Sequence, residues 1–313
     1  MPALIGGFGK INMNTIKINN TKSDINKRDV SKVIPEVRYK MGSYLAGLIE
    51  ANGSFAVHNK DSKTETYVPK ILVVFSIKQE SLVRYLARIT GAGTVYSRKN
   101  ANCIIWQIQE IKDVFNIINR INGYMRTPKI EALHRAIHWF NKSYIININC
   151  LGLDLSAIDS NAWLAGFTEG AGNFSITLNE KKKGNITTKR IQTFFRIKLK
   201  QNYHRDASLE QIETSYFVIL SKIARYLDVN LYSRTREKKD KVFYAFMIVS
   251  YNSTSHKKII NYFNNFPLYK TKHGVYEDWS NVVKKTILEA DKVLTEQDIL
   301  DVKKIKAKFN SLQ

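Results

Sequence analysis

The stretch Leu45-Ala46-Gly47-Leu48-Ile49-Glu50-Ala51-Asn52-Gly53 decides the fold, because it returns 119 positions later as Leu164-Ala165-Gly166-Phe167-Thr168-Glu169-Gly170-Ala171-Gly172. Each copy is an apolar helix with an Ala-Gly pair, then an acidic residue, then a glycine that opens a strand. A repeat of this kind predicts two copies of one structural unit. Small residues let helix backbones approach closely, so we expect the two repeat helices to lie against each other at the centre of the molecule.

The composition favours a polyanion as partner. The chain has 313 residues and a formal net charge of +22, from 49 Lys and Arg against 27 Asp and Glu. Such an excess repels itself on a compact protein and calls for a partner of opposite charge. No apolar run reaches the length of a membrane-spanning helix, so nucleic acid fits better than a membrane. Cys103 and Cys150 have no metal-ligand spacing and are expected to be reduced thiols.

Both halves of the chain predict the same order of elements, namely helix, two strands, helix, two strands and further helices. In the first half, the second strand is expected at 67–79. In the second half, helices are expected at 208–227 and 271–289. The expected organisation is a polar leader at 1–37, a first unit at 38–145, a linker at 146–160, a second unit at 161–290 and a C-terminal helix at 291–313.

The double motif resembles the LAGLIDADG family of homing endonucleases and intron maturases, in its single-chain, two-motif form. The resemblance covers about residues 38–290. It implies an α+β fold of two pseudo-symmetric αββαββα units whose saddle-shaped antiparallel sheets each face one half of a long DNA site. It also implies that the two motif helices form the interface, and that their last acidic residues hold divalent metal at the scissile phosphates.

The chain departs from the family at those metal positions, which are Asn52 and Ala171. Magnesium prefers hard oxygen ligands such as carboxylates, and two-metal cleavage of a phosphodiester needs ions at both the attacking and leaving oxygens. Glu50 and Glu169 lie two positions earlier, which is about 200° around a helix, so we expect them to point away from the site. The sequence therefore predicts no bound metal as written, and Mg²⁺ only if cleavage is retained or restored. Whether the two substitutions are natural stays open.

Four other positions of the family's site are occupied here. Gln79 and Gln201 match polar residues that orient water, and Lys129 and Lys272 match basic residues near the scissile phosphates. Because these residues recur at matching places in both halves, we favour an inherited site that holds a phosphate without cutting it. The alternative is that all four are ordinary surface residues.

Strand alternation predicts the nucleic-acid-binding face, since side chains of alternate residues point to opposite sides of a sheet. The segment 181–205 carries many Lys and Arg residues but no Asp or Glu, and its basic residues alternate with Ile197 and Leu199. Arg and Lys can pair with guanine edges in DNA or hold RNA phosphates, and charge alone does not distinguish the two. The expected face carries Ser54, His58, Lys60, Lys70, Ser76, Lys78, Tyr96 and Arg98 in the first unit, and Asn173, Ser175, Thr177, Asn179, Gln192, Arg196, Lys198, Lys200, Tyr232, Arg234 and Arg236 in the second.

The first nine residues, Met1-Pro2-Ala3-Leu4-Ile5-Gly6-Gly7-Phe8-Gly9, resemble a segment of cytochrome c oxidase subunit 1. This resemblance implies an upstream exon that runs into an intron reading frame, and hence a protein of the mitochondrial matrix. Together with the lost carboxylates, it favours a monomeric, cleavage-deficient maturase-type cofactor for splicing of a group I intron. One alternative is a homing endonuclease that cuts the intron-less exon junction. Another is a structural RNA-bound component of a mitochondrial assembly.

Overall fold

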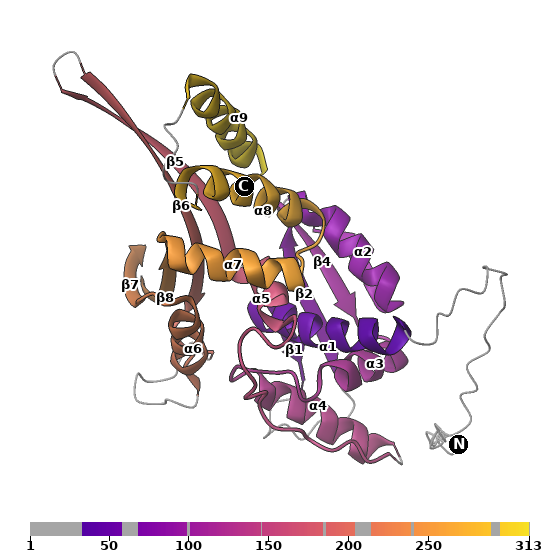
Figure 1. Cartoon of the computed structure of the whole chain (residues 1–313). Coiled ribbons are helices and arrows are strands. Elements are labelled where there is room, and N and C mark those ends of the chain that lie inside the picture. Colours follow the sequence, from indigo (N-terminus) through magenta and orange to yellow (C-terminus); the bar gives the residue numbers. More distant parts are fainter. Residues whose placement is uncertain are drawn as a thin grey trace, which may run out of the picture.

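The computed structural model describes residues 33–57, 68–98, 101–144, 146–183, 186–203, 214–238, 241–288 and 295–312. Two units of helices and strands flank a central pair of helices, α1 and α5 (Figure 1). The first unit consists of α1 Val33–Asn52, β1 Gly53–Ala56, β2 Lys70–Ser76, a 3₁₀ turn Ile77–Gln79, α2 Glu80–Thr90, β3 Thr94–Ser97, β4 Cys103–Ile108, α3 Ile111–Ile121 and α4 Ile130–Ser143.

The second unit repeats this order and adds a C-terminal helix. It consists of α5 Trp163–Ala171, β5 Gly172–Lys183, β6 Ile186–Lys200, α6 Phe217–Leu227, β7 Leu231–Lys238, β8 Lys241–Ser250, α7 Ser253–Asn265, α8 Lys270–Val283, a π-helical turn Lys284–Leu288 and α9 Glu296–Leu312.

Each unit has one four-stranded antiparallel sheet. The strand orders are β1-β2-β4-β3 and β5-β6-β8-β7, and the registers correspond, because Gly53 pairs with Val73 while Gly172 pairs with Ile197. The predicted α+β fold of two related units is therefore confirmed. No helix within the described ranges is long and apolar enough to cross a membrane.

Some element boundaries differ from the sequence prediction. The strand expected to run to Gln79 ends at Ser76, whose hydroxyl accepts a hydrogen bond from the backbone N–H of Lys78 and so starts a 3₁₀ turn. The helix expected from Ser208 begins at Phe217, and residues 204–213 lie outside the described ranges. The first motif helix begins earlier than expected, at Val33, with Pro35 in a first turn that tolerates the missing N–H.

The two motif helices pack with their backbones in contact. A Cβ added at Gly47 would collide with the carbonyl oxygen of Trp163, and one added at Gly166 would collide with that of Tyr44. The helices also share a hydrogen bond, from the backbone N–H of Ala162 to Ser43 Oγ at 3.2 Å. The expectation that the Ala-Gly pairs permit close helix packing is confirmed.

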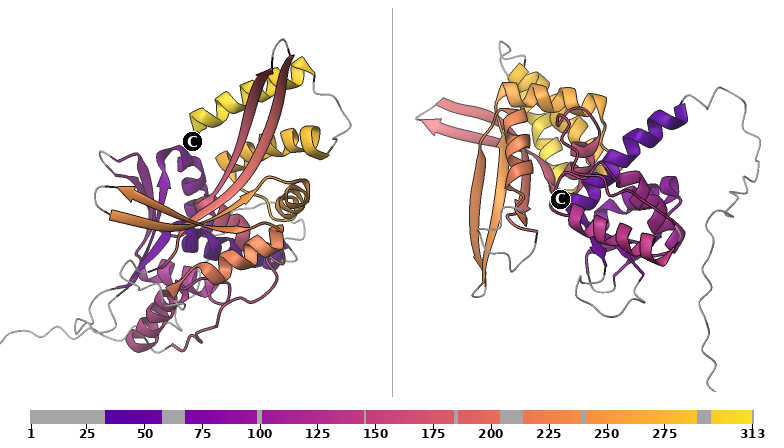
Figure 2. Two further views of the ribbon diagram at one scale, coloured as in Figure 1. Left: turned by 90° about the vertical axis from the view of Figure 1, so that its left-hand side faces the viewer. Right: turned by 90° about the horizontal axis from the view of Figure 1, so that it is seen from below.

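Each sheet has one buried and one outward face. Alternate residues Ile71, Val73 and Phe75 of β2 are buried, as are Phe195 and Ile197 of β6. The long β5–β6 hairpin extends beyond the body of the molecule with α9 beside it (Figure 2), and α9 buries Val302 and Phe309 against the core. The outward faces are thus supported from behind by packed helices.

Candidate nucleic-acid interface and inherited active site

A buried lysine holds the C-terminal end of each motif helix. Lys129 Nζ donates to the carbonyl oxygens of Ile49 at 3.0 Å, Glu50 at 2.7 Å and Gly53 at 2.6 Å. Lys272 Nζ donates in the second unit to the matching carbonyl oxygens, those of Thr168 at 2.9 Å, Glu169 at 2.7 Å and Gly172 at 3.0 Å. Carbonyls at a helix C-terminus have no partner within the helix, and a cation there is favoured by the helix dipole.

These contacts give Lys129 and Lys272 a structural role at the helix ends. An ammonium group has three donors, and in both residues three donors go to backbone carbonyls. Burial lowers the pKa of Lys129 from 10.5 to about 7 and also lowers the pKa of Lys272, while the nearby Glu50 and Glu169 act in the opposite direction. A phosphate would have to displace a helix carbonyl in order to bind either ammonium group.

The Glu50 carboxylate points into the protein interior. It accepts hydrogen bonds from the backbone N–H groups of Arg126 at 3.0 Å and Thr127 at 2.6 Å, and from the Trp163 indole of the other motif helix. The residue has no exposed surface. Burial raises its pKa, and these hydrogen bonds act in the opposite direction.

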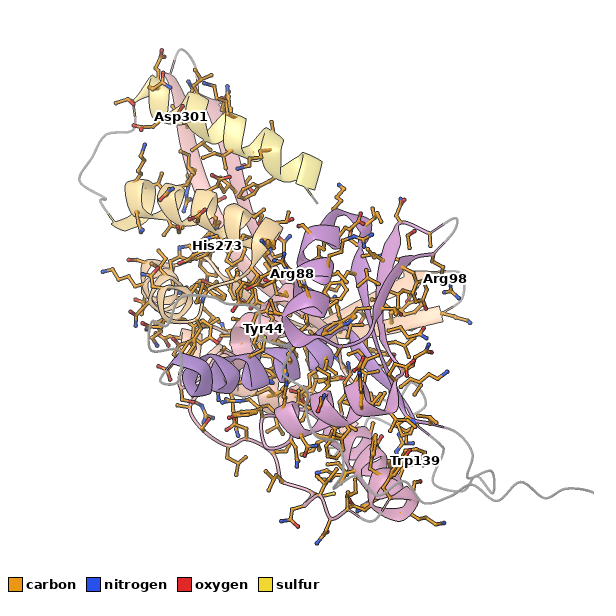
Figure 3. All side chains as sticks on the ribbon, turned by 90° about the vertical axis from the view of Figure 1, so that its right-hand side faces the viewer. Tyr44, Arg88, Arg98, Trp139, His273 and Asp301 are labelled. Carbon is orange, nitrogen blue, oxygen red and sulfur yellow. The ribbon has the colours of Figure 1, made fainter. Side chains whose placement is uncertain are left out.

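Glu169 occupies the corresponding place in the second unit. Its carboxylate accepts a hydrogen bond from the backbone N–H of Tyr269 at 3.0 Å and lies beside the buried Tyr44 of the first motif helix. Burial raises its pKa, against the effect of Lys272. Tyr44 and Trp163 each precede a Leu-Ala-Gly sequence, so each helix contacts the glutamate of the other. Figure 3 shows Tyr44 at the centre of the molecule.

The metal positions of the family therefore lack suitable ligands in this chain. Asn52 and Ala171 lie half-buried at the adjoining helix ends. A Cβ added at Gly170 would meet Ala51 Cβ at 2.6 Å and Asn52 Cγ at 2.7 Å. Within the described part of the chain, no group of three or more His, Cys, Asp or Glu side chains could hold a metal ion. One amide, one methyl group and two interior glutamates do not make the carboxylate-rich oxygen site that Mg²⁺ prefers.

The two candidate glutamines have different surroundings. Gln79 Nε2 reaches from the first unit to the carbonyl oxygen of Glu169 at 3.5 Å, beside an open hollow of about 260 Å³ that Lys78 and Asn173 also line. Gln201 is buried, and its Nε2 donates to Ser233 Oγ at 2.7 Å. Only Gln79 lies at the end of a motif helix, so the inherited arrangement is asymmetric.

The second sheet gathers the predicted basic residues on one face. Directly paired residues of neighbouring antiparallel strands share a face of the sheet, so the register fixes its membership. Among the described residues, this face has no Asp or Glu. It carries Asn173, Ser175, Thr177 and Asn179 of β5, Gln192, Phe194, Arg196, Lys198 and Lys200 of β6, Tyr232, Arg234 and Arg236 of β7, and Phe243, Ala245, Met247 and Val249 of β8.

The first sheet presents a less charged face. Tyr96 is exposed and donates its hydroxyl hydrogen to Gln107 Oε1 at 2.7 Å, and Arg98 lies at the periphery of the first unit in Figure 3. His58 and Lys60 lie outside the described residues, while Lys78 is exposed in the 3₁₀ turn. The outward positions are Ser54, Ala56, Lys70, Leu72, Val74, Ser76, Thr94, Tyr96, Cys103, Ile105 and Gln107.

The sequence prediction omitted the inner strands β4 and β8 from both faces. Ile105 and Gln107 of β4, and Phe243 and Met247 of β8, face outward because they pair with predicted face residues. These strands are apolar on both sides, so period-two alternation does not single out an outward set. Pairing β8 with the basic strand β6 would have identified these residues.

Comparisons with known proteins agree with the fold and the repeat. The model of the LAGLIDADG endonuclease family matches residues 45–140 and 164–283. The chain is 39% identical over 306 residues to "Intron-encoded DNA endonuclease aI3" of Saccharomyces cerevisiae, covering 90% of this chain and 72% of that protein. It is 30% identical over 269 residues to "Uncharacterized cox1 intron-2 37.2 kDa protein" of Schizosaccharomyces pombe, covering 85% of this chain and 71% of that protein.

Solved structures show the same fold at lower identity. The LAGLIDADG homing endonuclease I-GzeII in complex with its DNA target superposes with a TM-score of 0.59 and 20% identity, covering 87% of this chain and 99% of that chain. I-SmaMI bound to cleaved DNA gives a TM-score of 0.59 at 16% identity, covering 87% of this chain and 97% of that chain. Since the family model matches both repeats and the yeast relative aligns along most of both chains, the protein belongs to the LAGLIDADG endonuclease family.

Proposed function

We propose that this chain binds intron RNA without cutting nucleic acid, and that it acts as a maturase-type cofactor for splicing of a mitochondrial group I intron. One contrast carries the proposal. Both metal positions, Asn52 and Ala171, lack a carboxylate, whereas the outward face of the second sheet keeps Arg196, Lys198 and Arg234. The chain has thus lost the family's means of cleavage but kept a surface for a polyanion.

A maturase-type role needs binding alone from the protein. Splicing by a group I intron is catalysed by the RNA, so a protein that stabilises the folded intron needs no metal carboxylates of its own. Glu50 and Glu169 would not replace the missing ligands, because each carboxylate accepts hydrogen bonds inside the protein and is buried.

The mitochondrial location rests on two further observations. The first nine residues resemble a cytochrome c oxidase subunit 1 segment, and one relative is named as a cox1 intron protein of Schizosaccharomyces pombe. The RNA ligand is therefore proposed to be the intron that encodes the protein itself. With both units in one chain, the protein would act as a monomer in the matrix.

The second candidate is a homing endonuclease that cuts the intron-less exon junction. It is favoured by the yeast relative, which is named a DNA endonuclease, and by the DNA-bound structures that share the fold. In this chain it would require cleavage without a carboxylate at position 52 or 171, or an opening of the helix interface that frees Glu50 and Glu169.

One experiment separates the two candidates. The protein is incubated with precursor RNA that contains the intron, and separately with duplex DNA of the intron-less junction, at matched magnesium and salt concentrations. Faster splicing with intact duplex is the outcome that the proposal predicts. Cleaved duplex without any effect on splicing would refute the proposal and support the endonuclease.

A further inference from the structure

The outward face of the second sheet contains an open hollow of about 910 Å³. Its lining includes Lys198, Lys200, Arg234, Arg236, Phe243 and Met247, from strands β6, β7 and β8. The hollow lies away from the ends of the motif helices, where Asn52 and Ala171 stand, so it is separate from the inherited cleavage site.

The strand register explains why a hollow forms there. Ala245 of β8 pairs with Lys200 on one side and Arg234 on the other. Its methyl group leaves space between two long cationic side chains. Next along the strand, Phe243 pairs with Arg236, and the Phe243 side chain is 53% exposed. An accessible aromatic ring thus stands beside a pair of cations.

This part of the ribbon extends beyond its counterpart in the first unit. The registers make Ala245 equivalent to Cys103 and Arg234 equivalent to Arg98, at the end of the β3–β4 ribbon. Strands β7 and β8 have 8 and 10 residues, against 4 and 6 for β3 and β4. Phe243 and Arg236 therefore belong to an extension that strands β3 and β4 lack.

The combination of ring and cations suits an unpaired nucleotide. In a duplex the faces of the bases are covered by their neighbours, and only base edges reach the grooves. An unpaired base exposes its face and can stack on an aromatic ring while cations hold the phosphates. A second ring on the same sheet face, Phe194, already has the Arg196 guanidinium at 4.4 Å from its centroid.

We infer that this hollow binds an unpaired nucleotide, with the base stacked on Phe243 and the flanking phosphates held by Lys200, Arg234 and Arg236. The inference deepens the proposed function, because it names single-stranded segments of the RNA as the part that the second sheet holds. Duplex DNA laid across the same face would contact the cations but would gain nothing from the face of the ring.

Equilibrium binding of short fluorescent oligonucleotides to the full chain tests this inference. The ligands are single-stranded RNA, single-stranded DNA and duplex DNA of one sequence. Phe243→Leu keeps apolar bulk and removes the ring, so affinity for single strands should fall by roughly 5- to 150-fold, the range for loss of one stacked base. Affinity for the duplex should stay unchanged. Phe243→Trp, which keeps an aromatic face, should bind single strands at least as well as the native chain.

Phe217→Leu is the matched control, since Phe217 of α6 is 52% exposed and lies outside the hollow. It should bind all three ligands like the native chain. A loss with single-stranded RNA alone would support the inference and show that the ribose contributes. Unchanged single-strand binding by Phe243→Leu, or an equal loss with the duplex, would overturn it. Splicing is scored separately, so a Phe243-dependent binder that fails to promote splicing would refute the maturase role and leave the inference intact.

Discussion

Replacement of Gly166 by alanine should destabilise the protein, because this glycine is where the two motif helices touch. A Cβ at position 166 would overlap the Tyr44 carbonyl oxygen and would lie 2.7 Å from Tyr44 C and 2.9 Å from Leu48 N. All three atoms belong to the backbone of a buried helix, so no side chain can turn aside. Carbon atoms in contact prefer separations of about 3.5–4.0 Å, and the helices would have to separate by on the order of 1 Å.

The expected cost follows from two opposing effects. Overpacking a close-packed core costs about 1–3 kcal/mol and sometimes more, and separation of the helices would also strain the hydrogen bond from Trp163 to Glu50. The alanine recovers up to ~1 kcal/mol of helix propensity. We expect a net loss of about 2 kcal/mol or more in the free energy of unfolding, measured by urea denaturation without ligand.

Gly274→Ala is the matched control for that measurement. Gly274 lies in α8, and an added Cβ would meet nothing within 4 Å. This substitution should stabilise the protein by up to ~1 kcal/mol. If Gly166→Ala raises the free energy of unfolding as Gly274→Ala does, the close contact between the motif helices is not present in solution.

Three further predictions concern the face, the helix ends and the core. Neutralising Arg196, Lys198 and Lys200 should lower the slope of log affinity against log salt by about 0.7–0.9 for each phosphate that is no longer neutralised, whereas neutralising Lys303, Lys304 and Lys306 of α9 should change it much less; equal reductions in the slope would mean that total charge drives binding. Lys129→Met leaves buried helix carbonyls without a donor and should cost about 1–3 kcal/mol of stability in thermal or urea unfolding, and an unchanged midpoint would contradict the role given to this lysine. Burial lowers the pKa of His256 from 6.5 to about 4; the unfolded chain then binds the extra proton between these pH values, so stability falls as the pH drops through this window, by up to about 3 kcal/mol. His256→Phe should remove that share of the acid sensitivity, and an identical pH profile of unfolding for both proteins would refute it.

The sequence was sufficient to predict the features that depend on local pattern. The repeated Ala-Gly pairs predicted the helix contact, and period-two alternation predicted that Ile71, Val73 and Phe75 face the core, as they do. The family resemblance supplied the strand order, which alternation alone does not determine.

Features that depend on contacts between distant segments could not be predicted. Lys129 reaches carbonyl oxygens some 80 positions earlier in the chain, and only the docking of α4 beside the end of α1 brings them together. Gln79 and Gln201 occupy matching positions in sequence, yet Gln201 is buried against Ser233. The hollow beside Phe243 depends on the pairing of β8 with two basic strands, which neither strand reveals by itself.

A cleavage assay on the junction duplex in magnesium tests the loss of cleavage most directly, with the chain as written and with a variant that combines Asn52→Asp and Ala171→Asp. Both proteins should bind the duplex, since neither change touches the basic face of the second sheet. The chain as written should leave the duplex intact, and the double variant should nick or cut it, because it restores carboxylate ligands at the ends of both motif helices. Efficient cutting by the chain as written would contradict the proposed loss of cleavage and would point to Glu50 and Glu169 as metal ligands.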